Sequence, residues 1–162
     1  MGEQEGDRTA LTLSRVFDAP RERVWNAWTD PELVKGWWGP KGFTSPAGMI
    51  DLRVGGSYLF CMRSPEGKEY WSTGKYLEIE PPRRLVCTDS FADERGNVVP
   101  ASYHGMESDF PLELQVTVTF EEEDGKTLMN LSHVGFPAGQ VAEEAATGWS
   151  ESFDKLEQLV SQ

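Results

Sequence analysis

Two segments of the chain are similar to catalytic or phosphate-binding motifs, and each lacks a residue that the chemistry needs. Gly148-Trp149-Ser150-Glu151-Ser152 begins like the nucleophile elbow GxSxG, but Ser152 stands in place of the second glycine. Gly125-Lys126-Thr127 ends like a phosphate-binding loop, but Phe120 stands where its first glycine is required. We therefore expect neither a nucleophilic serine nor a phosphate site, and no residue is predicted to be catalytic.

The only two histidines, His104 and His133, are far apart in the sequence. His104 shares a loop with Glu107 and Asp109, which could hold a metal only weakly, and a solvated loop histidine is the simpler interpretation. His133 has the same strand parity as Leu131, so we expect it to face the C-terminal helix. It would serve there either as a hydrogen-bonded core residue or as a polar anchor in a cavity. We expect no metal and no cofactor.

Aromatic side chains are the feature that best indicates a binding site. Four of the six tryptophans lie within residues 25–38, and tryptophans at that density must be sheltered by the fold or line a pocket. Small-molecule sites are mostly apolar with a few placed polar groups. The predicted cavity residues are Trp37, Tyr58, Phe60, Met62, Trp71, Tyr76, Val116, Val118, His133, Trp149 and Phe153, with Arg53, Arg63 and Tyr103 as polar anchors.

Two alternatives to this binding site stay open. Ordinary core packing explains most of the predicted cavity residues without any ligand. Arg53 shares a strand face with Asp51, so the two could form a structural ion pair instead of holding an anionic ligand.

Composition limits the class of protein. The chain has 162 residues and a net charge of −12, which argues against nucleic acid or anionic lipid as a partner. No apolar run approaches the roughly 20 residues that span a bilayer, so we expect no membrane insertion and a cytoplasmic location. We expect a polar tail at 1–9, one domain at 10–162, and a monomer or weak homodimer. The two cysteines, Cys61 and Cys87, are predicted to be buried free thiols.

The spacing of apolar residues predicts the elements that must position these side chains. Residues 11–17 alternate like a strand, and Pro20 and Pro31 each begin a short helix. From residue 43 to residue 134, short alternating runs separated by turn residues predict an antiparallel sheet. The loop 91–111 has no periodicity and is a candidate lid over a cavity. Beyond residue 137, apolar residues at helical spacing predict one long C-terminal helix.

Six short motifs follow one another along the chain: Asp18-Ala19-Pro20, Trp28-Thr29-Asp30-Pro31, Trp37-Trp38-Gly39-Pro40, 51–56, 62–67 and Gly148-Trp149. In this order they resemble the AHSA1-like (activator of Hsp90 ATPase homologue 1-like) family of the START/Bet v 1 (SRPBCC) superfamily, over about residues 10 to 160. The resemblance implies an α+β helix-grip fold. A curved six-stranded antiparallel sheet would wrap around the C-terminal helix, with two short helices between strands 1 and 2.

Three functions remain open at this stage. The leading one is binding of a small hydrophobic or aromatic molecule, lipid-like or polyketide-like, between the sheet and the C-terminal helix. The second is a protein-interaction module of the co-chaperone type with a chaperone partner, and the third is a cyclase-like or hydrolase-like enzyme acting on a polyketide or aromatic substrate. Cavity volume separates the second from the others, because a void above roughly 300 Å³ favours a ligand site.

Overall fold

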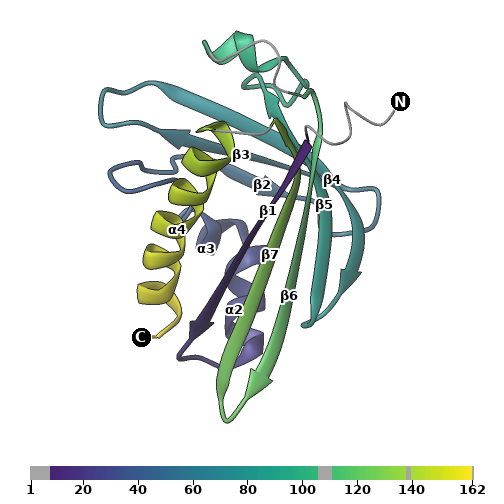
Figure 1. Cartoon of the computed structure of the whole chain (residues 1–162), viewed down its shortest axis with the longest axis vertical. Coiled ribbons are helices and arrows are strands. Elements are labelled where there is room, and N and C mark those ends of the chain that lie inside the picture. The colour runs from purple at the N-terminus through teal and green to yellow at the C-terminus, as the bar shows by residue number, and fades with distance from the viewer. Residues whose placement is uncertain (1–7, 106–110, 138–139, 162) are drawn as a thin grey trace.

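The computed structural model describes residues 8–105, 111–137 and 140–161, and it is an α+β structure as predicted. One sheet, two short helices and a long C-terminal helix make up the fold (Figure 1). In chain order the elements are β1 (Arg8–Phe17), α2 (Arg21–Thr29), α3 (Pro31–Val34), β2 (Gly48–Ile50), β3 (Ser57–Arg63), β4 (Glu69–Glu80), β5 (Arg84–Ala92), η1 (Ala101–His104), β6 (Leu114–Glu123), β7 (Lys126–Pro137) and α4 (Gln140–Val160).

The sheet has seven antiparallel strands in the order β1-β7-β6-β5-β4-β3-β2, not the six that were predicted. The shortest strand is β2, which has only three residues and pairs with β3 at one edge of the sheet. Pro46 cannot donate to a ladder just before β2, and a turn at residues 51–56 follows it, so the strand stays short. β1 begins at Arg8, so the last two residues of the expected polar tail belong to the sheet, and 1–7 lie outside the described residues.

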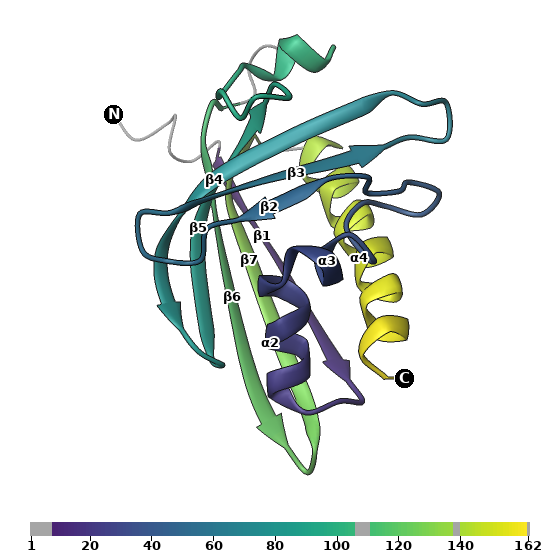
Figure 2. The same cartoon turned by 180° about the vertical axis from the view of Figure 1, so that it is seen from behind.

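The sheet is strongly bent. β6 and β7 run along the length of the molecule, whereas β3 and β4 cross its upper part (Figures 1 and 2). The register between β4 and β5 shifts between Tyr76 and Glu78. Close by, a Cβ atom at Gly74 would lie 1.8 Å from the Thr88 carbonyl oxygen, so only glycine lets the two backbones approach this closely. The bend creates the space that the helices fill.

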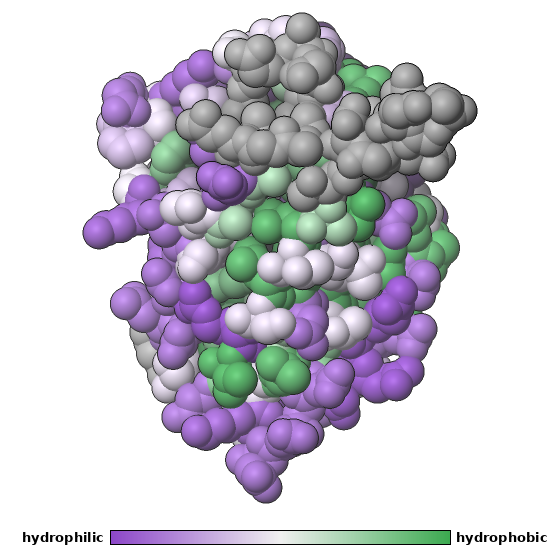
Figure 3. Space-filling model, viewed as in Figure 1, coloured by the Kyte–Doolittle hydropathy of each residue, from purple (hydrophilic) through white to green (hydrophobic). Residues whose placement is uncertain are grey.

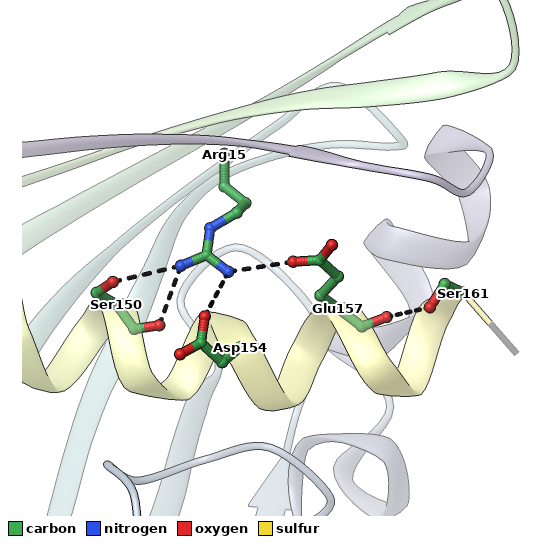
Figure 4. A network of polar contacts seen from close by, with 5 residues as sticks. All are labelled: Arg15, Ser150, Asp154, Glu157 and Ser161. Carbon is green, nitrogen blue, oxygen red and sulfur yellow. Dashed lines mark hydrogen bonds and ion pairs between the residues drawn. The ribbon is translucent and has the colours of Figure 1, made fainter.

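Helix α4 is fastened to the rest of the molecule by cations from other segments and by its own lysine. The Arg15 guanidinium on β1 donates to Asp154 Oδ1 at 2.9 Å and to the Ser150 carbonyl oxygen at 3.1 Å (Figure 4). Lys155 Nζ donates to the Phe43 carbonyl oxygen at 3.2 Å, and Arg23 donates to the last carbonyl of the helix at Val160. These bonds fix α4 over the sheet at both its middle and its C-terminal end.

Hydrophilic residues make up much of the surface, in keeping with the high net charge of the chain (Figure 3). On the face that carries α4 and β1, hydrophilic residues border a paler, partly hydrophobic centre (Figure 3).

Both cysteines are buried and free, as predicted. In the part of the chain that the structure describes, no helix is long and apolar enough to cross a membrane.

Replacing Arg15 by methionine (R15M) should lower the free energy of unfolding by about 1 to 2 kcal/mol, because it removes charge-assisted bonds to α4 while keeping the alkyl packing. Equilibrium urea unfolding measures the change. The matched control is R83M, which breaks the exposed Arg83–Glu80 pair and should cost less than about 0.5 kcal/mol. Equal losses in the two variants would contradict the assigned role of Arg15.

Candidate functional site

The tryptophan-rich segment is positioned by two short helices. Pro31 begins α3, and the Asp30 carboxylate caps it by accepting a hydrogen bond from the Glu32 backbone at 3.0 Å. The chain then turns back so that the Trp37 indole donates to the Ala27 carbonyl oxygen at 2.9 Å. Trp37 is therefore fully buried in the core and does not line a cavity.

A mainly apolar cavity lies between these helices, the bent sheet and α4. Its volume is about 20 Å³, roughly the space of one water molecule and far below the roughly 300 Å³ of a ligand pocket. Its walls are mostly aromatic: the rings of Tyr58 and Phe60 stack at 4.8 Å, and Trp28 stacks with Trp149 at 6.0 Å. The lining residues are Trp28, Trp38, Tyr58, Phe60, Tyr76, Leu85, Cys87, Asp89, Val116 and Trp149.

A partly buried chain of polar side chains runs along one wall of this cavity. Tyr58 Oη donates a hydrogen bond to Asp89 Oδ1 at 3.1 Å. His133 Nε2 lies 2.9 Å from Asp89 Oδ2, which is an ion-pair distance, but the two atoms are not aligned for a hydrogen bond. On its other side, His133 Nδ1 accepts a hydrogen bond from the Trp149 indole at 3.0 Å. Because an indole can only donate, Nδ1 carries no proton, and the proton of neutral His133 sits on Nε2, facing the carboxylate. We call these four residues the polar chain.

Burial favours the protonated form of two tyrosine hydroxyls and one thiol in the cavity wall. Burial, and next the Asp89 charge, raises the pKa of Tyr58 well above its ordinary value of 10.0. The same two causes raise the pKa of the Cys87 thiol, and burial raises the pKa of Tyr76. A thiol that stays protonated is a weak nucleophile, so Cys87 is a wall residue and not a reactive one.

Trp28 has a buried donor that the protein does not satisfy. Its side chain is 7% exposed, and its Nε1 has no hydrogen-bond partner among the described residues. A buried N–H without a partner costs about 1 to 3 kcal/mol. Trp37 and Trp149, which pack against the same ring, both have their indole N–H bonded.

The predicted cavity residues divide into three groups. Tyr58, Phe60, Tyr76, Val116 and Trp149 line the cavity, and His133 reaches it through Trp149. Trp37, Val118 and Phe153 lie in the core behind it. Met62 and Trp71 are half-buried outside the lining, and the three predicted polar anchors are exposed: Arg53 pairs with Asp51, Arg63 pairs with Glu69, and Tyr103 is 60% exposed on η1.

Sequence reasoning missed five lining residues: Trp28, Trp38, Leu85, Cys87 and Asp89. One signal was present, because Asp89 is the one charged residue in the strand run 85–92. A charge there must be exposed or paired. Its partner His133 is on β7, on the far side of β6 from β5, and the sequence does not predict that the two side chains meet.

The loop 91–111, the candidate lid, contains a β-bridge and a short helix in the part that the structure describes. Ala92 bridges Val98, and the chain then forms η1. His104 is buried there, not solvated as predicted, because its Nε2 hydrogen-bonds with the Ala92 carbonyl oxygen at 2.9 Å. Glu107 and Asp109 lie outside the described residues, and no three metal-ligating side chains gather among the described ones.

A second depression, of about 400 Å³, lies on the surface between the start of α2 and the strands β5 and β6. Its charges compensate one another: Arg83 pairs with Glu80, and the Glu122 carboxylate accepts a hydrogen bond from the Arg21 backbone at 2.8 Å. The balance of charge gives it no preference for an anionic or a cationic ligand.

Comparison with known proteins places this geometry in a family. Residues 18–161 match the family model described as "Activator of Hsp90 ATPase homolog 1-like protein". The fold is similar to the crystal structure of a protein from Nitrosomonas europaea, with a TM-score of 0.77 and 27% identity over 94% of each chain. A protein from Chromobacterium violaceum is 28% identical, with a TM-score of 0.77 over 94% of this chain and 97% of that one.

A third similar structure is CalU16 from Micromonospora echinospora, at 26% identity and a TM-score of 0.64 over 94% of this chain and 76% of that one. No curated protein matches the sequence.

The raised pKa of Tyr58 predicts how stability changes in alkali. Above pH 10.0 the unfolded chain loses the phenolic proton and the folded chain keeps it, so the free energy of unfolding falls as pH rises toward the folded-state pKa. In Y58F this fall should be shallower, as measured by urea unfolding between about pH 8 and pH 11. Y103F, at an exposed ring, should keep the wild-type slope. A Y58F slope equal to that of the wild type would contradict the assignment.

Proposed function

The chain belongs to the Activator of Hsp90 ATPase homolog 1-like family, and we propose that it binds a small aromatic molecule at the cavity between the sheet and α4. Side chains of the wall nearly fill this cavity, and we expect it to enlarge when aromatic side chains of the wall move outward. The ligand would replace ring-to-ring contacts of the protein with contacts to its own ring.

The polar chain is the observation that carries this proposal. A core that only packs would be at least as stable with apolar residues in these positions, since it costs free energy to take a carboxylate with a 23% exposed side chain and a buried imidazole largely out of water. Here Asp89 and His133 are held against the aromatic wall by partners on β3 and α4. Placed polar groups in an apolar cavity are the usual composition of a ligand site.

The small volume sets a condition on binding. With about 20 Å³ available, an aromatic ring enters only if wall residues give way. Trp38 and Trp149 are the wall residues best suited to move, because both rings are half-buried and large. The proposal therefore requires local opening of the cavity without unfolding of the sheet.

Alkylation of the two cysteines by iodoacetamide tests this opening. Cys87 lines the cavity and Cys61 does not, so saturating ethylbenzene or acetophenone should slow modification of Cys87 at least fivefold more than modification of Cys61. Peptide mass spectrometry of the native protein with and without probe gives both rates. Comparing each thiol with itself removes the difference in their reactivity. Equal slowing of both thiols, or of neither, would mean that the cavity does not open locally to admit a ring.

A second candidate function is a protein-interaction module, which the nearly filled interior favours. Three apolar side chains lie exposed in and after the edge strand β2: Met49 is 65% exposed, Val54 64% and Leu52 40%. Exposed apolar residues near an unpaired strand edge suit a protein partner. The family description suggests that this partner is an Hsp90-type chaperone.

The test of this second function measures the ATPase rate of a purified Hsp90-type chaperone with and without this protein. An interaction module should raise the rate, and the M49S/V54S double variant should raise it at least twofold less because the partner loses apolar contact area. L112S, at another exposed apolar residue, is the control. An unchanged ATPase rate with the wild-type protein would remove this candidate.

A further inference from the structure

The starting observation is the indole N–H of Trp28. Trp28 lines the cavity and is more than nine-tenths buried, and its Nε1 has no hydrogen-bond partner among the described residues. The rings of Trp37, Phe120 and Trp149 pack against the Trp28 ring, and the face of an aromatic ring is a weak acceptor. Native proteins satisfy the great majority of buried donors, so one left unpaired at a cavity points to a missing acceptor.

The cavity also restricts the charge of what supplies that acceptor. Its lining contains one carboxylate, Asp89, and no lysine or arginine is among the lining residues that the structure describes. The Arg53 and Arg63 side chains are at the surface in ion pairs of their own. A carboxylate, phosphate or sulfonate group entering the cavity would therefore meet like charge with no cation to offset it.

The shape of the walls restricts the rest of the ligand. Trp28 and Trp149 stack with an interplanar angle of 25°, and Tyr58 and Phe60 with one of 26°. Flat walls of this kind favour a planar ring, which can stack on one face and meet the edge of a second aromatic side chain.

Resting on the proposed function, we infer that the ligand is an uncharged aromatic carbonyl compound, such as an aryl ketone or quinone, whose oxygen accepts the hydrogen bond of Trp28 Nε1–H. A hydrocarbon of the same shape would leave this donor unpaired. An aromatic carboxylate would satisfy the donor but would be repelled by Asp89. The cavity should thus favour an uncharged aromatic carbonyl compound over both the hydrocarbon and the carboxylate.

Acetophenone, ethylbenzene and benzoate are matched probes for this inference, because they differ mainly in the group attached to the ring. Titration calorimetry of the full chain should show acetophenone binding about tenfold more tightly than ethylbenzene, with benzoate not binding at concentrations that saturate with acetophenone. In W28F the ratio of the two affinities should fall to about one. W38F, a tryptophan of the same wall, should keep the wild-type ratio.

The ratio within each variant removes any general loss of affinity caused by the substitution. If W28F does not fold, NMR of the wild-type protein replaces the calorimetry of this variant. The assigned indole N–H proton resonance of Trp28 should move downfield with acetophenone and not with ethylbenzene.

The outcomes separate the two proposals. Binding of both neutral probes with equal affinity, an unchanged ratio in W28F, or binding of benzoate would overturn the carbonyl inference and leave the cavity as a site for aromatic ligands. Failure of every probe to bind the wild-type protein would overturn the proposed function and the inference together.

Discussion

The contacts of the Trp28 ring join the short helices, the sheet and the C-terminal helix α4. Its centroid lies 4.8 Å from that of Trp37, 6.0 Å from Trp149 and 6.4 Å from Phe120. The partners come from the segment after α3, from α4 and from β6. A bent sheet leaves more space than a single helix can fill, and these rings fill it. The cavity is the small space that these rings leave unfilled beside the polar chain.

The polar chain depends on the same packing. Its members come from β3, β5, β7 and α4, and the Trp149 indole reaches His133 because α4 is fixed over the sheet. The tautomer of His133 follows from the Trp149 indole, which has a proton to give and no lone pair to accept one. In an apolar setting such a set of groups specifies one arrangement of the surrounding elements, because partial satisfaction would leave a buried charge or donor unpaired.

The cations that hold α4 lie away from the cavity. In a chain with a net charge of −12, Arg15, Arg23 and Lys155 bind the helix to neighbouring segments. Burial lowers the pKa of Lys155, and the Glu151 charge opposes that shift. None of these three cations is among the residues that line the cavity. The placement of charge that anchors the helix therefore leaves the described lining without a lysine or arginine.

Much of the fold could be predicted from the sequence because its signals are local. The alternation in 11–17, the prolines that begin the two short helices, the glycine-containing turns and the helical spacing after residue 137 each depend on neighbours within a few residues. The ion pair of Arg53 with Asp51 was foreseeable for the same reason. The very short β2 was harder, since three residues carry little periodicity and the strand exists only through its pairing with β3.

The site was predicted only in part because it depends on which distant residues meet. Alternation correctly set Tyr58 and Phe60 on one inner face, but it could not tell that Trp37 would be sealed in the core while Trp28 and Trp38 line the cavity. Those outcomes follow from the angle between α2, α3 and α4. The sequence by itself determined the elements and their buried faces. Only the tertiary structure decided the cavity, the partner of Asp89 and the unpaired indole of Trp28, because each is a contact between segments that the chain order leaves unconstrained.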